Sequence, residues 1–89
     1  MIVDVRRPDE WVTGHAAGAV HIPVDDVLER GEAELPKDRD LLFICAAGVR
    51  SGLAAEMASA LEFAPEHLYN IEAGTPVWIQ EGLPTDTGD

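Results

Sequence analysis

Three things are scarce in this chain of 89 residues: cysteines, basic side chains and long apolar runs. The single cysteine excludes an internal disulfide and fits a reducing compartment, so we expect a cytoplasmic location. Six Lys and Arg stand against 17 Asp and Glu, a net charge of −11, which argues against binding to nucleic acid or to an anionic membrane. No apolar run approaches the roughly 20 residues of a membrane span, and no signal-peptide pattern opens the sequence.

What is present is an apolar content of 46%, enough for one folded domain over residues 1–89. Short apolar runs alternate with helical patterns, which predicts an α/β class: a small, mainly parallel sheet with helices on both faces. The run LLFIC (41–45) is continuous, as in a strand buried on both sides. The predicted strands are 2–5, 20–22, 41–45 and 68–71; the predicted helices are 8–12, 24–30, 51–63 and 76–82, with 31–40 as a surface loop.

The only cysteine, Cys45, stands where the central predicted strand ends and a loop runs into the helix 51–63. Ligands bind at the carboxyl ends of strands in parallel sheets, and a helix N-terminus lowers the pKa of a nearby thiol. The loop that follows is Ala46, Ala47, Gly48 and Val49. Its small residues allow its N–H groups to turn inward as an anion-binding nest. Arg50 closes the loop and can offer a bidentate fork to an oxyanion.

Taken singly, each of these features has an ordinary structural explanation. A lone cysteine after an apolar strand is usually buried packing, and a lone arginine is usually a surface charge. Their combination at one strand–loop–helix junction favours a nucleophilic role for Cys45. Asp4 ends a strand at the same sheet edge, where it either bonds the loop or caps a turn. His15, His21 and His67 lack the spacing of metal ligands, so we expect structural roles and no metal site.

Three stretches resemble a known family: DVRRPDEWVTGHAAGAVHIP (4–23), CAAGVRSGLAAEMASALE (45–62) and AGTPVWIQEGLP (73–84). In this order they are similar to a single-domain rhodanese-like sulfurtransferase, a three-layer α/β/α fold, and they span nearly the whole chain. Two departures stand out. The first strand begins almost at Met1, without the family's usual N-terminal extension. The C-terminal turn has Gly74-Thr75 where the family often has paired glycines.

The resemblance implies that Cys45 takes a sulfane sulfur from a small anionic donor such as thiosulfate and becomes a persulfide. The sulfur then passes to cyanide, a thiol or a partner protein, without a metal or organic cofactor. Loop N–H groups from Ala46 to Arg50 would hold the persulfide charge, and Arg50 would bind the sulfonate oxygens. Supporting positions in the matching stretches are Asp4, Arg6, His15, Gly18 and Ser51.

The length of the loop separates sulfur chemistry from phosphate chemistry. Only four residues, AAGV, lie between Cys45 and Arg50. A related phosphatase class has one more, and its wider loop accepts phosphate. We therefore expect a sulfurtransferase of the thiosulfate type, and keep two alternatives: a sulfur-relay or interaction module with little free turnover, and a small cysteine phosphatase or arsenate reductase.

Overall fold

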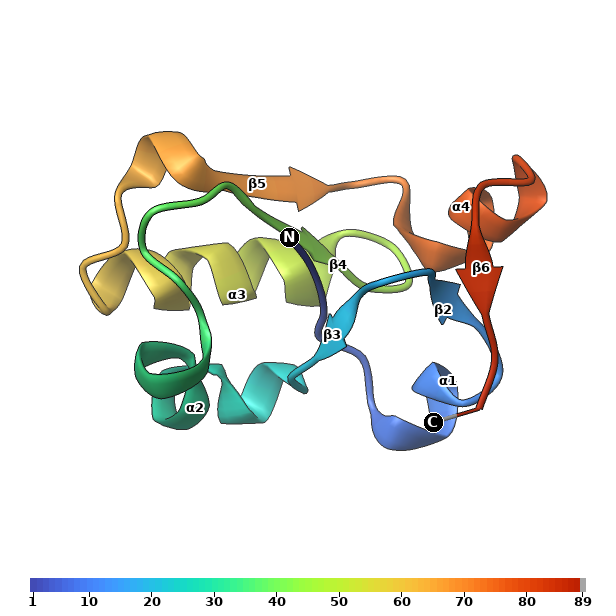
Figure 1. The fold of residues 1–89 in the computed structure, drawn as a ribbon, viewed down its shortest axis with the longest axis horizontal. Helices are drawn as coiled ribbons and strands as arrows, with labels where there is room; N and C mark the ends of the chain where they lie inside the picture. The colour runs from blue at the N-terminus through green and yellow to red at the C-terminus, as the bar shows by residue number, and fades with distance from the viewer. Residues whose placement is uncertain (89) are drawn as a thin grey trace.

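Four parallel strands form the central sheet of the computed structural model, which describes residues 1–88 (Figure 1). In sheet order they are β3 (Val20–His21), β1 (Ile2–Asp4), β4 (Leu41–Ile44) and β5 (Leu68–Ile71). The two central strands, β1 and β4, pair with Val3 opposite Phe43. The predicted α/β class with a mainly parallel sheet flanked by helices is confirmed.

Helices α2 (Val27–Glu34) and α3 (Val49–Ala60) run along the sheet and contact each other (Figure 1). Two shorter helices, α1 (Pro8–Trp11) and α4 (Gly74–Gln80), lie beyond the carboxyl ends of the strands. Beside them β2 (His15–Ala16) pairs antiparallel with β6 (Thr85–Asp86). Single 3-10 turns, η1 (Val24–Asp26) and η2 (Pro65–His67), precede α2 and β5. No helix within residues 1–88 is long and apolar enough to cross a membrane.

The core lies between one face of the sheet and the helices α2 and α3. Successive strand residues point to opposite faces, so Val3, Phe43 and Cys45 join one cluster with Ala54 and Ala58 of α3. On the other face Asp4 and Ile44, at the carboxyl end, are fully buried. Near the amino end of that face, Leu42 is half-buried and Tyr69 is exposed. The sheet is thus best covered where its strands end, next to Cys45.

The structure corrects the predicted loop 31–40, because α2 continues through Glu34. The predicted helix ends at residue 30, so Gly31 falls in the predicted loop. Instead it is buried where α2 approaches α3, and a Cβ there would lie only 3.2 Å from Leu61. An ion pair from Arg30 to Glu34, 2.6 Å long and four residues apart, supports the last turn.

Helix α3 begins at Val49, two residues earlier than predicted, and α4 begins at Gly74 rather than at residue 76. The residue before α3, Gly48, has a φ of 89° that glycine adopts without strain. The chain therefore turns sharply into the helix. Val49 and Arg50 belong both to the loop after Cys45 and to the first helical turn.

Candidate active site

Cys45 follows β4 directly and is only 1% exposed, with its thiol unpaired in any disulfide. The backbone N–H of Gly48 donates to its Sγ over 3.0 Å, so the loop folds back onto the sulfur. The Cys45 carbonyl accepts a 2.7 Å hydrogen bond from the N–H of Thr75. Cys45 is thus held from two sides, its sulfur by the loop that follows it and its carbonyl by the turn that starts α4.

The hydroxyl of Ser51 continues this contact set from the first turn of α3. Its Oγ lies 3.3 Å from Sγ of Cys45 and also donates to Oδ1 of Asn70 in β5. The Asn70 amide donates in turn to the carbonyl of Gly48 over 3.1 Å. Because Ser51 has one proton, it cannot donate fully to both Asn70 and a thiolate. Ionisation of Cys45 therefore favours turning that proton toward the sulfur.

These contacts settle the direction of the Cys45 pKa. Burial raises the pKa of the thiol and is the largest single effect, but it is opposed by hydrogen bonds from the Ser51 hydroxyl and backbone N–H. The N–H groups of Ala47 and Gly48 lower the pKa further, so it lies below its ordinary value. The chemical meaning is a thiolate available at lower pH than for a free cysteine.

Replacing Ser51 by alanine should therefore raise the pKa of Cys45, because the hydroxyl that stabilises the thiolate is lost. The measurement is the rate of alkylation by iodoacetamide as a function of pH, since only the thiolate reacts. Ser59→Ala is the matched control, because Ser59 is exposed on the same helix. A pH profile of Ser51→Ala identical to that of Ser59→Ala would contradict the role of the hydroxyl.

Two glycines let the loop lie against the turn 72–75. A Cβ on Gly48 would stand 2.9 Å from the carbonyl oxygen of Glu72, and Gly74 comes closer still to the backbone of Ala46. Both glycines have positive φ, 89° and 81°. Backbone approaches of this kind leave no room for a side chain. The Gly74-Thr75 pair differs from the paired glycines that the family often has at this turn. It still has glycine at the position where the turn meets the Ala46 backbone.

Arg6 and Asp4 form a fully packed ion pair next to this loop. Nη2 of Arg6 lies 2.8 Å from Asp4 Oδ2 and donates to the Gly14 carbonyl over 2.7 Å. The Asp4 carboxylate accepts the Arg6 backbone N–H two residues further on, as in an Asx turn, and also binds the Arg6 side chain. Of the two roles considered for Asp4, the structure therefore favours the capping of a turn. His15 is buried, with Nδ1 2.8 Å from the Trp11 carbonyl and its ring stacked on the Trp11 indole. Both groups support the segment that carries α1.

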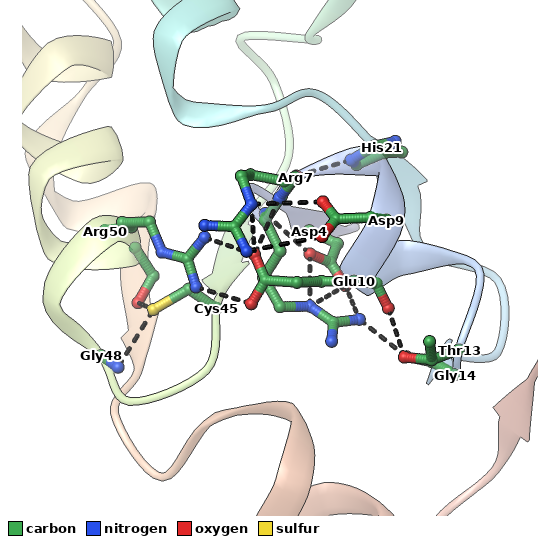
Figure 2. Close-up of polar contacts among 12 residues, drawn as sticks. Asp4, Arg7, Asp9, Glu10, Thr13, Gly14, His21, Cys45, Gly48 and Arg50 are labelled. Carbon is green, nitrogen blue, oxygen red and sulfur yellow. Dashed lines mark hydrogen bonds and ion pairs between the residues drawn. The ribbon is translucent and has the colours of Figure 1, made fainter.

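Arg50 closes the loop as expected, yet its guanidinium is directed toward Glu10 of α1 (Figure 2). Two bonds, of 2.6 Å and 3.0 Å, join Nη1 and Nη2 to the two carboxylate oxygens. The Arg50 hydrogen bonds hold the pKa of Glu10 at about 2, although burial opposes them. The pKa of Arg50 is raised, chiefly by the Glu10 hydrogen bond and in part by the charge of Cys45.

Two residues of the site, Asn70 and Glu10, were not predicted from the sequence. Asn70 had a faint signal, a polar residue inside the otherwise apolar strand LYNI. Glu10 had none, because 40 residues separate it from Arg50. Trp78 lines a cavity of about 280 Å³ beside α4, together with Ile71, Val77 and Leu83. Within residues 1–88 no group of three or more His, Cys, Asp and Glu side chains could hold a metal ion.

A family model described as the rhodanese-like domain matches residues 1–81, and the chain belongs to this family. Solved structures agree with the fold. The rhodanese-like domain of an Anabaena protein superposes with a TM-score of 0.86 at 28% identity, covering 96% of this chain and 95% of that one.

Curated relatives carry sulfurtransferase names. A sulfurtransferase of Allochromatium vinosum is 32% identical over 94% of this chain and 76% of its own length. The thiosulfate sulfurtransferase PspE of Escherichia coli is 36% identical over 68% of this chain and 60% of its own. An HTH-type transcriptional regulator of Mycobacterium tuberculosis is 33% identical over 98% of this chain, which spans only 38% of that regulator. The chain thus belongs to a sulfurtransferase-type family, and similar domains occur within longer proteins.

Proposed function

We propose that this chain transfers a sulfane sulfur from thiosulfate or a persulfide donor, through a persulfide on Cys45, to a thiol or cyanide. The observation that carries the proposal is the cradle around Sγ. The N–H of Gly48 lies at 3.0 Å and the Ser51 hydroxyl at 3.3 Å, in a loop with four residues before Arg50. Donors placed in this way stabilise a negative charge on sulfur.

The reaction proceeds in two steps that share this cradle. The Cys45 thiolate attacks the outer sulfur of thiosulfate, the S–S bond of the donor breaks, and sulfite leaves with the bonding electrons. The product is a persulfide anion, whose terminal charge needs the same N–H donors. Cyanide or a thiolate then attacks the terminal sulfur, takes it as thiocyanate or a new persulfide, and restores the Cys45 thiolate. No proton, metal or external oxidant enters either step.

Intact-mass spectrometry tests this proposal most directly. Incubation with thiosulfate or an organic persulfide should add one sulfur atom to the protein, and a cyanide chase should remove it. A protein that gains no sulfur from either donor would refute the proposal. Hydrolysis of an aryl phosphate, lost in Cys45→Ser, would instead support the phosphatase alternative.

A sulfur relay toward a partner protein is the second candidate, and one observation favours it. Val49, inside the loop and at the start of α3, is 80% exposed, an apolar side chain next to the nucleophile. Such a residue suits contact with an organic or protein donor better than with a hydrated anion. The relay predicts slow turnover of thiosulfate but rapid exchange of sulfur with a partner. Either function suits a reducing, cytoplasmic setting, in which the Cys45 thiol stays free.

A further inference from the structure

The arginine expected to receive the donor's oxygens is already occupied by a carboxylate of this chain. Arg50 binds Glu10 through both terminal nitrogens, at 2.6 Å and 3.0 Å (Figure 2). A sulfonate would use the same bidentate fork of the guanidinium. Glu10 and an anionic donor therefore compete for one group. The donor must break a part-buried ion pair before Arg50 can assist it.

Glu10 is the fixed member of this pair. Its Oε1 also accepts the backbone N–H of Arg7 over 3.1 Å, which ties the side chain to the start of its own helix. Its side chain is 22% exposed, against 30% for that of Arg50. With a pKa of about 2, caused mainly by the Arg50 hydrogen bonds, Glu10 stays charged at any physiological pH. Release of Arg50 thus requires the arginine to move, not the glutamate.

The other arginines nearby offer no substitute. Arg6 is buried against Asp4 at 2.8 Å. Arg7 is exposed and pairs with Asp9 at 3.2 Å. Each of the arginines beside the site therefore has a carboxylate partner, and their charges cancel locally. In a chain with a net charge of −11, a small dianion has no compensating attraction at longer range.

We propose that Glu10 is a selectivity residue that masks Arg50, weakens binding of small anionic donors, and favours an organic persulfide. The catalytic part of this inference rests on the proposed function; the masking of an anion site does not. An organic persulfide needs no sulfonate receptor. The Cys45 thiolate attacks its outer sulfur, the S–S bond breaks, and the donor's own sulfur leaves as a thiolate. The exposed Val49 supplies apolar contact to such a donor.

The first test measures anion binding without any sulfur transfer. Inorganic sulfate should protect Cys45 from alkylation by neutral iodoacetamide when it occupies the loop. We expect the half-protecting concentration to fall about tenfold in Glu10→Gln, the factor that about 1.4 kcal/mol represents. Glutamine keeps an oxygen for the Arg7 N–H, so the fold should be retained, and thermal unfolding checks this.

Asp9→Asn is the matched control. It also removes one negative charge, at the residue next to Glu10, but Asp9 belongs to an exposed ion pair with Arg7. We expect less than about a twofold change there, since exposed pairs are screened and weak. The gain in Glu10→Gln should also vanish in an Arg50→Ala background, a result that a general loss of structure would not produce. Equal gains in Glu10→Gln and Asp9→Asn, or no gain in Glu10→Gln, would overturn the proposal.

The second test compares donors by the rate of sulfur addition to Cys45. Glu10→Gln should raise kcat/KM for thiosulfate about tenfold through KM, and leave the rate with a small neutral organic persulfide within about twofold. A parallel rise with both donors would argue that Glu10 controls thiolate reactivity instead of selectivity. If neither donor adds sulfur while sulfate protection still depends on Glu10, the proposed function fails and the masking stands.

Discussion

The Cys45→Ser protein is expected to form no persulfide and to lose sulfur transfer by about 10³-fold or more, the usual scale for removal of a nucleophile. A serine hydroxyl at the same place is barely ionised near neutral pH, and the cradle that lowers the pKa of Cys45 cannot make up the difference. Formation of thiocyanate from thiosulfate and cyanide measures the loss.

The fold of this variant should survive, which makes the result specific. Although Cys45 is only 1% exposed, its sulfur faces polar groups, the Gly48 N–H and the Ser51 hydroxyl. A serine oxygen can accept from both, so we expect the free energy of unfolding to change by less than about 1 kcal/mol. Denaturant unfolding checks this. Transfer that persists in a stable Cys45→Ser protein would show that another group carries the sulfur.

The strand–loop–helix unit around Cys45 could be predicted because its signals are local. A continuous apolar run, one cysteine, small residues and an amphipathic helix follow one another within residues 41–63. Parallel sheets place such junctions at their carboxyl edge. The loop's tightness was also visible as the four residues between Cys45 and Arg50. The start of α3 at Val49 was less visible, because it depends on the positive φ of Gly48.

Features that depend on contacts between distant segments were missed. Gly31 has the local character of a helix end, and only the approach of α3 makes it a good interior residue of α2. Strands β2 and β6 have two residues each and pair across most of the chain, so no periodicity marks them. For the same reason, the sequence does not reveal the ion pair between Arg50 and Glu10, which lie 40 residues apart. A charged side chain in the sequence does not show whether it meets substrate or another side chain.

We expect Gly74→Ala to destabilise the protein more than any other glycine-to-alanine substitution near the site. Its Cβ would overlap the Ala46 carbonyl oxygen and stand 2.9 Å from that of Cys45. Because both contacts are to backbone, neither can rotate away, and the φ of 81° adds strain for any residue but glycine. We expect the free energy of unfolding to fall by about 3 kcal/mol or more, measured by denaturant unfolding.

Gly82→Ala separates the clash from the backbone strain. Gly82 also has a positive φ, 74°, but a Cβ there meets nothing within 4 Å. This control should cost only about 1 kcal/mol, the usual strain of a non-glycine residue in that region. If both variants lose the same stability, the contact between the 72–75 turn and the loop is not what requires glycine.

Activity should separate the two variants more sharply than stability does. The turn that holds Gly74 also places the Thr75 N–H, which donates to the Cys45 carbonyl over 2.7 Å. A displaced turn releases that carbonyl, and the loop after Cys45, which carries the N–H groups of Ala47 and Gly48, is then held less firmly against the sulfur. Even well below its unfolding transition, Gly74→Ala should therefore show a raised Cys45 pKa in the alkylation profile and slower persulfide formation, while Gly82→Ala shows neither. A folded Gly74→Ala protein with normal thiolate reactivity would mean that the loop holds its shape without support from this turn.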